Sequence, residues 1–424
     1  MSSKTPPSAL VPKLRFPEFQ SAGNWTTKKL GALATISTEK VGTNSCVPMS
    51  ITSGVGLVSQ EDKFGRVIAG DSYKNYLLLK PHDFAYNKSA TKEYPEGFLT
   101  LYSGTKLAAV PNSIFTCFRI SGDSPDVRFL NYQFSDNLHG RWLRQFIQVG
   151  ARAHGSLSIN DNDLMALPVP VPAGTTSVDE QKKIADCLSS VDELIAAQAR
   201  KVDALKTHKK GLMQQLFPRD GETQPRLRFH EFKDDGEWVT EPLVHLADYE
   251  NGKAYEKDIA ENGKYVVVNS RFISTDGAIR KYSNADYLIA KTGEVLMVLS
   301  DLPKGKALAK CFFVEADDRY AVNQRVCRLK PTRIDGKFLY YILNRHPRLL
   351  AFDDGLNQTH LSKGGVTECP LCVPAEKAEQ QRIAACLSSL DALITAETQK
   401  LEALKTHKKG LMQQLFPSPE EVDA

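Results

Sequence analysis

Two loops carry side chains whose hydrogen-bonding groups suit base edges and phosphates. Residues 150–158 and residues 355–362 each contain a histidine and a Leu-Ser pair. Asparagine and glutamine can pair bidentately with adenine, and arginine with guanine. The candidate nucleic-acid contacts in these loops are Arg152, His154, Ser156, Asn357, Gln358, Thr359 and His360. The alternative interpretation is a pair of ordinary solvated loops, each preceding a strand.

A second group of candidates consists of cations near a predicted strand–turn–strand unit in each half of the chain. A cation at such a position can meet a phosphate, although charged side chains are more often only a solvated surface. The candidates of this group are Lys88, Lys92, Arg271, Lys304 and Lys306.

Motifs for catalysis and for metal binding are weak. The chain has no Asn-Pro-Pro-aromatic motif, no glycine-rich cofactor loop and no P-loop, so we expect no catalytic residue. Pro125-Asp126 could open a nuclease motif, but the matching Glu180-Gln181-Lys182 lies far downstream at a helix start. Cys369-Pro370-Leu371-Cys372 is the one C-x-x-C, and a zinc site needs a second pair of ligands. Its apolar neighbours favour a buried strand, so no metal site is predicted.

Two long amphipathic helices are predicted to hold these loops in place. In residues 181–218 and again in residues 380–417, apolar side chains recur at steps of four and three, as in a heptad seam. We expect the helices to pair as an antiparallel coiled coil, with polar seam residues Gln198, Lys209, Glu397 and Lys408 setting the register. The alternative is that these polar residues simply reach solvent. The predicted seam residues are Ile184, Leu188, Val191, Ile195, Val202, Leu205, Leu212, Leu216, Ile383, Leu387, Leu390, Ile394, Leu401, Leu404, Leu411 and Leu415.

The ends of the first helix have sequence signals of their own. Ser177 followed by Glu180 predicts a capping box at its start, and Pro218 ends it. A helix of roughly 35 residues is about 50 Å long at ~1.5 Å per residue. Leu205–Pro218 and Leu404–Pro417 are identical, LKTHKKGLMQQLFP. This identity predicts either contacts with identical partner subunits or a recent duplication.

The chain is two copies of one plan. LRFPEF at residues 14–19 matches LRFHEF at residues 227–232, and Trp25 matches Trp238. The intervening middles differ in sequence but share a skeleton, in which Phe118-Arg119-Ile120 parallels Cys327-Arg328-Leu329. We therefore predict a pseudo-twofold repeat of two mixed α/β domains with short strands and few helices, each leading into one long helix.

Composition sets broad limits. The net charge of +4 permits a nucleic-acid partner but does not argue for one, and no apolar run approaches the ~18 residues of a membrane span. The eight cysteines are scattered, which is typical of reduced thiols in cytosol. The first 13 residues lack the apolar core of a signal peptide and are expected to be a floppy tail.

The two variable middles, each with an LRFPEF-like opening and a helix ending in KKGLMQQLFP, resemble the DNA-specificity subunit of a Type I restriction–modification system. The resemblance covers nearly the whole chain. It implies a cytoplasmic, non-catalytic subunit in which each middle is a target-recognition domain that reads one half of a split DNA site. The helices would be spacers that set the separation of the half-sites and dock two modification (methyltransferase) subunits. S-adenosylmethionine would belong to those partners, and ATP and Mg²⁺ to a motor-nuclease partner.

The predicted ranges follow from this plan. They are 1–13 for a disordered tail, 14–175 for the first target-recognition domain, 176–218 for the first long helix, 219–226 for a linker, 227–375 for the second recognition domain, 376–418 for the second long helix and 419–424 for a tail. Two alternative functions remain open at this stage. One is a protein-binding coiled-coil scaffold without DNA specificity, and the other is an enzyme with an unrecognised site.

Overall fold

The computed structural model describes residues 10–52, 55–147, 157–302 and 305–417. The chain forms two compact units, which we call unit 1 (Met1–Ala199 with Gln399–Ala424) and unit 2 (Arg200–Thr398). Two long helices, α6 (Ser177–Leu216) and α11 (Lys377–Leu415), each contribute one half to each unit. The predicted fold class, two strand-rich α/β domains and two long helices, is confirmed. The units differ from the predicted ranges because each long helix is divided between them.

Unit 1 is built on two four-stranded sheets and a two-stranded ribbon. The sheets have the orders β2-β9-β6-β7, which is antiparallel, and β4-β3-β8-β5, in which β3 and β8 are parallel. β1 pairs with β10. The elements are β1 (Thr26–Lys29), α1 (Leu30–Leu33), β2 (Ala34–Ser37), β3 (Val47–Thr52), β4 (Gly56–Ser59), α2 (Gln60–Phe64), β5 (Leu77–Leu79), β6 (Phe84–Asn87), β7 (Phe98–Leu101), β8 (Ala108–Val110), β9 (Phe115–Ile120), α3 (Val127–Ser135), α4 (Leu138–Leu143), α5 (Asp161–Met165) and β10 (Pro168–Val171).

Unit 2 repeats this plan in the same chain order. The sheet β12-β20-β16-β18 corresponds to the first sheet of unit 1. In β13-β15-β14-β19, the strands β15, β14 and β19 correspond to β4, β3 and β8, while β13 is an additional edge strand and β5 is matched only by the isolated bridge of Ile289 with Ala321. The ribbon is β11 with β22. The elements are β11 (Val239–Pro242), β12 (Ala247–Asn251), β13 (Ile259–Ala260), β14 (Tyr265–Val268), α7 (Ser270–Ser274), β15 (Tyr282–Ser283), β16 (Val295–Val298), β17 (Ser300–Asp301), β18 (Cys311–Phe313), β19 (Tyr320–Val322), β20 (Val326–Pro331), α8 (Gly336–Leu343), α9 (Pro347–Leu350), β21 (Thr359–His360), α10 (Lys363–Thr367) and β22 (Pro370–Val373).

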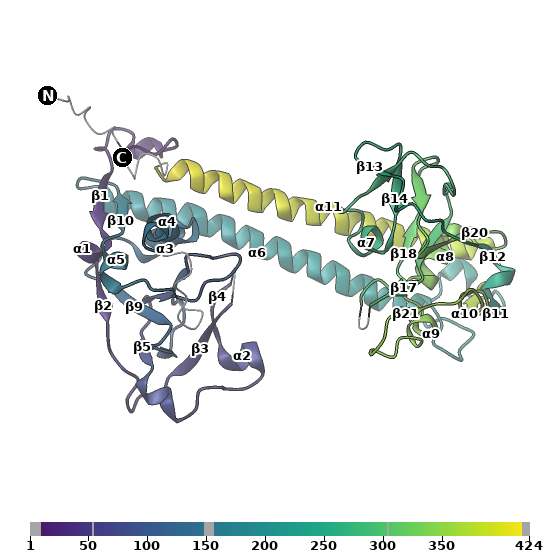
Figure 1. Ribbon diagram of the computed structural model, residues 1–424, viewed down its shortest axis with the longest axis horizontal. Coiled ribbons are helices and arrows are strands. Elements are labelled where there is room, and N and C mark those ends of the chain that lie inside the picture. Colours follow the sequence, from purple (N-terminus) through teal and green to yellow (C-terminus); the bar gives the residue numbers. More distant parts are fainter. Residues whose placement is uncertain (1–9, 53–54, 148–156, 303–304, 418–424) are drawn as a thin grey trace. The chain divides into compact units, whose positions relative to one another are not determined.

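Within each unit the two helix segments run antiparallel (Figure 1). In unit 1, Asp192 pairs with Lys408 at 2.7 Å, while the start of α6 and the end of α11 are joined through residues 14 and 15. In unit 2, Lys209 pairs with Asp391, and Lys201 pairs with Glu397. The seam lysines Lys209 and Lys408 therefore reach acidic partners on the other helix. All sixteen predicted seam residues are buried or half-buried.

A buried ion pair joins each opening motif to the start of a long helix. In unit 1, Arg15 donates to both carboxylate oxygens of Glu180 at 2.8 and 2.7 Å, and the indole of Trp25 donates to Glu180 at 3.1 Å. In unit 2, Arg228 donates to Glu379 at 2.8 and 2.7 Å, and Trp238 donates at 3.3 Å. Both carboxylate side chains are 1% exposed. We call each set of three residues a clamp.

The predicted capping box at Ser177 and Glu180 is wrong. The Ser177 hydroxyl donates to the carbonyl of Pro172 at 2.6 Å and accepts from Gln181 at 3.0 Å. Glu180 is engaged by Arg15 and Trp25 instead of the backbone at the helix start. A guanidinium and an indole brought in from far along the chain replace the local backbone partner, because a bidentate charge-assisted pair is the stronger interaction.

The predicted tail is too long by at least four residues. Leu10 is buried and forms a β-bridge with Trp25, whose N–H donates to the Leu10 carbonyl at 2.8 Å. Residues 1–9 and 418–424, at the two predicted tails, lie outside the described residues. The apolar run around Leu10 is too short to give a periodic signal, so its burial was missed.

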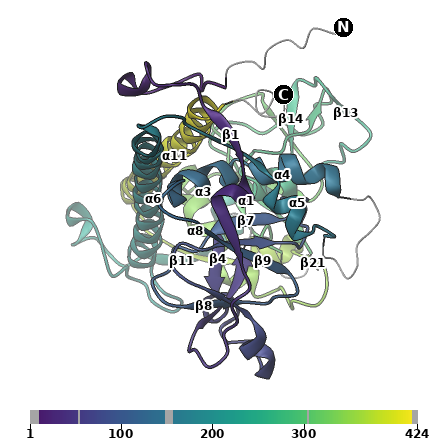
Figure 2. The same cartoon turned by 90° about the vertical axis from the view of Figure 1, so that its left-hand side faces the viewer.

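The main core of unit 1 lies where the antiparallel sheet, α3 and the two helix segments meet. α3 lies between this sheet and the first half of α6 (Figure 2). Trp25, Phe129 and Phe416 pack against each other there, with ring centroids 5.5 to 6.5 Å apart. In unit 2, Trp238, Phe338 and Phe217 form the same group at 5.5 to 6.4 Å. The opening motif, the first helix after the sheet and a helix end thus share one core in each unit.

The strand pairing corrects one predicted correspondence between the middles. Phe84 is opposite Phe118 in unit 1, and Val295 is opposite Leu329 in unit 2, so Phe118 matches Leu329 rather than Cys327. Arg119 and Arg328 are therefore two positions apart in the repeat. Because side chains two apart point to the same face of a strand, the sequence pattern does not detect this offset.

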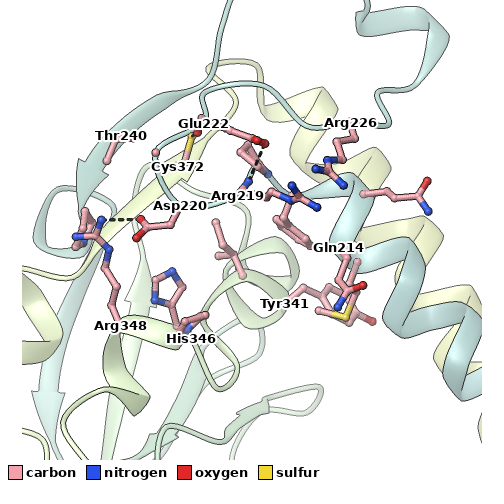
Figure 3. A pocket seen from close by; sticks show the side chains of 18 of the residues that line it. Gln214, Arg219, Asp220, Glu222, Arg226, Thr240, Tyr341, His346, Arg348 and Cys372 are labelled. Carbon is pink, nitrogen blue, oxygen red and sulfur yellow. Dashed lines mark hydrogen bonds and ion pairs between the residues drawn. The ribbon is translucent and has the colours of Figure 1, made fainter.

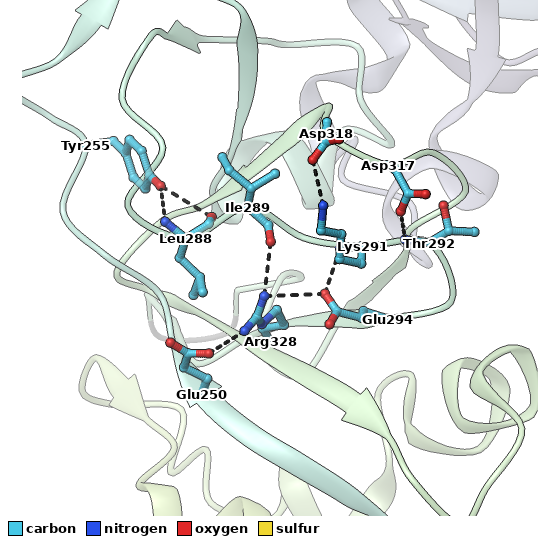
Figure 4. Close-up of polar contacts among 10 residues, drawn as sticks. All are labelled: Glu250, Tyr255, Leu288, Ile289, Lys291, Thr292, Glu294, Asp317, Asp318 and Arg328. Carbon is cyan, nitrogen blue, oxygen red and sulfur yellow. Dashed lines mark hydrogen bonds and ion pairs between the residues drawn. The ribbon is translucent and has the colours of Figure 1, made fainter.

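Both arginines nevertheless meet the equivalent carboxylate. Arg119 donates to Asp83 at 2.6 and 2.7 Å. Arg328 lies 3.8 Å from Glu294 and also bonds Glu250 and the carbonyl of Ile289 (Figure 4). Asp83 also accepts a hydrogen bond from the backbone N–H of Lys80, and Glu294 accepts one from the backbone N–H of Lys291. In both cases the donor lies three residues earlier in the chain, which closes a turn.

None of the helices in the described part of the chain combines the length and the apolar character required to cross a bilayer.

Candidate nucleic-acid interface

In unit 2 the predicted loop pairs with the strand that directly precedes the predicted cations Lys304 and Lys306 in the sequence. β17 (Ser300–Asp301) pairs with β21 (Thr359–His360), with Ser300 opposite His360 (Figure 1). The side-chain amide of Gln358 donates to the Ser300 hydroxyl at 2.9 Å. The loop that contains Asn357 to His360 is therefore attached to the segment that follows the predicted strand–turn–strand unit.

An open hollow of about 530 Å³ lies at this junction, and we call it the β17–β21 hollow. It is lined by Ser300, Gln324, Arg325, Gln358 and His360. Every lining side chain is polar, and four of the five are exposed. Such a surface can form hydrogen bonds with water or with a polar ligand, but it offers no apolar side chains against which an apolar ligand could be buried.

Thr359 differs from its neighbours in the predicted loop. Its side chain is buried, and its hydroxyl donates to the Asp353 carboxylate at 3.3 Å. Gln358 and His360, on either side of it, are exposed. Successive side chains of a strand point to opposite faces, so β21 turns Thr359 inward and His360 outward.

The remaining candidates of unit 2 are not among the residues that line the hollow, and one of them lies outside the described residues. Asn357 is exposed and donates its side-chain N–H to Asp354 at 3.1 Å, while backbone N–H groups lower the pKa of Asp354. Arg271 is exposed on α7, and its neighbour Ser270 donates to the carbonyl of Ser300 at 3.4 Å. Lys306 is exposed, and its carbonyl accepts from Arg345. Lys304 lies outside the described residues.

Sequence reasoning missed Gln324 and Arg325. They precede β20 (Val326–Pro331), which contains residues 327–329 of the predicted shared skeleton. The signal that could have found them is a pair of long polar side chains directly before an apolar strand. Loop ends near paired strands are common places for binding residues.

Unit 1 shows the equivalent junction in part. The N–H of Leu157 donates to the carbonyl of Lys88 at 2.8 Å, just as the N–H of Leu361 donates to that of Leu299. Lys88 is half-buried and lies 3.6 Å from Asp161, so an acidic partner already neutralises its charge. Lys92 is exposed in the turn after β6. Arg152, His154 and Ser156 lie outside the described residues.

A larger cavity of about 880 Å³ lies at the end of α6 in unit 2, and we call it the helix-end pocket (Figure 3). Met213, Gln214 and Phe217 line one side of it, from the sequence that is identical in both long helices. Arg348 pairs with Asp220 at 2.7 Å on another side. The pocket therefore joins a repeated helix end to charged residues that are particular to unit 2.

The C-x-x-C segment flanks this pocket without forming a ligand cluster. Cys369 is buried, its sulfur lies 3.6 Å from His346 Nδ1, and burial raises the pKa of the thiol to about 11. Cys372 lies on β22 and lines the pocket. Across residues 10–417, apart from the undescribed gaps, no three histidine, cysteine or carboxylate side chains gather as metal ligands would.

Comparisons of sequence point to one family. Residues 235–406 match the family described as the Type I restriction modification DNA specificity domain. The Type I restriction enzyme MjaVIII specificity subunit of Methanocaldococcus jannaschii is 24% identical over 288 residues, which cover 64% of this chain and 66% of that protein. The putative type I restriction enzyme MjaX specificity subunit of the same organism is 23% identical over 299 residues, covering 66% and 65%. The chain spans just under two thirds of the length of these curated relatives.

Comparisons of structure agree on the fold. The Type-I restriction-modification system S subunit from M. genitalium matches with a TM-score of 0.58 at 15% identity, covering 96% of this chain and 100% of that chain. A structure described by complex assembly and conformational transition of the type I R-M system matches with a TM-score of 0.55 at 15% identity, covering 93% and 98%. At such identities the likeness concerns the fold alone. The chain is therefore similar in sequence to Type I restriction–modification DNA-specificity subunits, and it shares their fold.

Proposed function

We propose that this chain is the non-catalytic DNA-reading subunit of a Type I restriction–modification complex. Each unit reads one half of a bipartite, gapped target on double-stranded DNA. The observation that carries the proposal is that both units repeat the same fold-determining contacts but differ in the polar side chains of their loops. The Arg–Glu–Trp clamps are equivalent, whereas the half-buried Lys88 of unit 1 stands at the backbone position of Leu299 in unit 2, where Gln358 and His360 are exposed nearby. Two recognition units that share a fold but differ in their contact residues should select different half-sites.

The identical helix ends support the docking of two copies of one partner. The sequence from Leu205 to Pro218 recurs unchanged from Leu404 to Pro417, and Met213, Gln214 and Phe217 line the helix-end pocket. Two identical surfaces suit two identical modification subunits, which would carry S-adenosylmethionine. A motor-nuclease partner would bring ATP and Mg²⁺.

The direct test of DNA reading is a salt titration. Binding of DNA by the full chain with its modification subunits should fall with the logarithm of salt concentration, with a slope of about −0.9 for each phosphate neutralised. It should also prefer one bipartite sequence over random DNA of equal length. Salt-independent binding, or equal binding of all sequences, would leave the chain as a protein scaffold and refute the proposal.

The spacer role has a test of its own. A second copy of residues 192–198 in α6, together with a second copy of residues 391–397 in α11, keeps the heptad pattern of both helices. Seven residues add ~10 Å at ~1.5 Å per residue, or about three base pairs at ~3.4 Å. Mapping of methylated adenines should show a gap that is longer by about three base pairs with unchanged half-sites. The control inserts seven residues at the exposed turn of Gly122 and Asp123, where the gap should stay the same; an unchanged gap with the lengthened helices contradicts the spacer role.

A further inference from the structure

We propose that Arg325 reads a guanine in the half-site taken by unit 2, from within the β17–β21 hollow. This inference rests on the proposed function. It assigns a base and a residue that sequence reasoning did not single out.

The backbone at Arg325 is held firmly while its side chain is exposed. The carbonyl of Arg325 accepts from the N–H of Leu299 at 2.9 Å, and the N–H of Val326 donates to Asn323 at 2.9 Å, which closes a tight turn. Asn323 and Val326 are buried on either side of the exposed pair Gln324 and Arg325. A reading side chain needs such a rigid base, because misplacement by about 1 Å weakens a bidentate contact.

The guanidinium of Arg325 has no acidic partner among the described residues. Many arginines of unit 2 do pair with carboxylates there, namely Arg228, Arg328, Arg333, Arg348 and Arg382. Acidic groups adjoining the hollow are already occupied. Asp301 accepts the backbone N–H groups of Leu302 and Ala307, and Glu256 accepts the amide of Gln324 at 3.2 Å. The positive charge of Arg325 is therefore available to a ligand.

The surroundings of Arg325 favour a base edge over a phosphate. The other lining residues are two glutamines, a serine and a histidine rather than further lysines or arginines. The Gln358 amide is oriented by its 2.9 Å bond to Ser300, which leaves its oxygen and one N–H for a ligand. Arginine donates in parallel to O6 and N7 of guanine, the commonest specific contact in the major groove.

The repeat places a different side chain at the same backbone position in unit 1. The N–H of Lys88 donates to the carbonyl of Ile114 at 2.8 Å, as that of Leu299 donates to Arg325. Ile114 is half-buried and offers no hydrogen-bond donor from its side chain. The inference therefore concerns one half-site only.

The test uses the full chain with its modification subunits and a randomised library of duplex DNA. Arg325→Ala should reduce a preference for guanine of roughly 10- to 100-fold to less than threefold at one position, within one half-site. Arg325→Lys should retain binding but only part of the preference, since ammonium does not form the fork of two parallel bonds. The matched control is Arg319→Ala, an exposed arginine of the same unit that stacks on Tyr320 and lies outside the hollow; its base preferences should be unchanged.

The outcomes separate this inference from the proposed function. Uniformly weaker binding by Arg325→Ala, with all base preferences intact and a salt slope smaller by about one, would assign Arg325 to a phosphate and overturn the inference. Unchanged selection would overturn it as well. Relaxation at a base other than guanine would refute the assigned base. If the unmodified chain selects no sequence, the proposed function itself fails.

Discussion

The two units agree where the opening motifs meet the long helices and differ where the loops are exposed. Glu180 and Glu379 each accept from an arginine and a tryptophan, and Asp192 and Asp391 each pair with a seam lysine of the other helix. At the exposed junctions, by contrast, Ile114 in unit 1 stands where unit 2 has Arg325. Contacts that specify the fold and residues available for recognition are thus separate, so the loops can change without disturbing the core.

The largest expected effect comes from breaking a clamp. Glu180→Ala or Glu379→Ala leaves a buried arginine without its counter-charge and an indole N–H without its acceptor, which costs about 3–5 kcal/mol. The two variants should lose equal stability, each in its own unit. Hydrogen exchange measured on peptides of unit 1 and unit 2 reports the free energy of opening for each.

A matched control tests whether charge removal alone has this effect. Asp318 pairs with Lys291 at 2.7 Å, but both side chains are more than half exposed. Asp318→Asn should therefore cost less than about 1 kcal/mol. A clamp variant that exchanges like the unmodified chain would show that the repeated contact does not hold the fold together.

Periodicity and repetition predicted much of this architecture. The four-three spacing of apolar residues indicated both long helices, and the shared skeleton indicated matching strands in middles of unlike sequence. Periodic spacing is a local property of the sequence and repetition is visible within it, so both can be recognised without a structure. The strand β22 (Pro370–Val373), which overlaps the C-x-x-C segment, could be predicted in the same way, because its residues are apolar.

The missed features depend on partners distant in the sequence. Glu180 was assigned to a capping box because its partner Arg15, 165 positions away, was not foreseeable from local spacing. The two-residue offset between Arg119 and Arg328 preserves the alternation of faces and leaves no trace in the pattern. Arg325 enters the candidate site only when β20 is placed beside β16, which brings Arg325 to Leu299.

A second comparison concerns acid sensitivity, which should be greater in unit 1. His139 is fully buried between Tyr86 and Phe134, and its Nε2 lies 3.4 Å from the Gly97 carbonyl. Burial lowers its pKa from 6.5 to about 4. The folded state therefore prefers the neutral ring, and the stability this contributes is present above pH 6.5 and lost as the pH falls toward 4. The difference corresponds to ~3 kcal/mol at the acid limit.

His139→Phe should remove this part of the acid sensitivity. Between pH 7 and 4.5, the opening free energy of unit 1 should fall less steeply in the variant than in the unmodified chain, whatever its value at pH 7. His245→Gln is the control, because the His245 side chain is 60% exposed and its replacement should leave the slope unchanged. Equal slopes for His139→Phe and the unmodified chain would contradict a neutral buried ring.

The smallest expected effect distinguishes the two turns that hold Asp83 and Glu294. Asp83 is fully buried and receives two short bonds from Arg119, whereas Glu294 lies 3.8 Å from an arginine that has two other partners. Asp83→Asn should cost about 2 kcal/mol, reduced from the value of two full charge-assisted bonds because Arg119 is 41% exposed. Glu294→Gln should cost less than about 1 kcal/mol, since its amide oxygen still accepts from the N–H of Lys291 and Arg328 keeps Glu250. Urea unfolding followed by circular dichroism gives both values. Equal losses of stability would mean that other contacts compensate for the offset between Arg119 and Arg328. A larger loss for Asp83→Asn would show that unit 1 relies on one strong arginine–carboxylate contact. In unit 2 the arginine instead divides its contacts among Glu294, Glu250 and the Ile289 carbonyl.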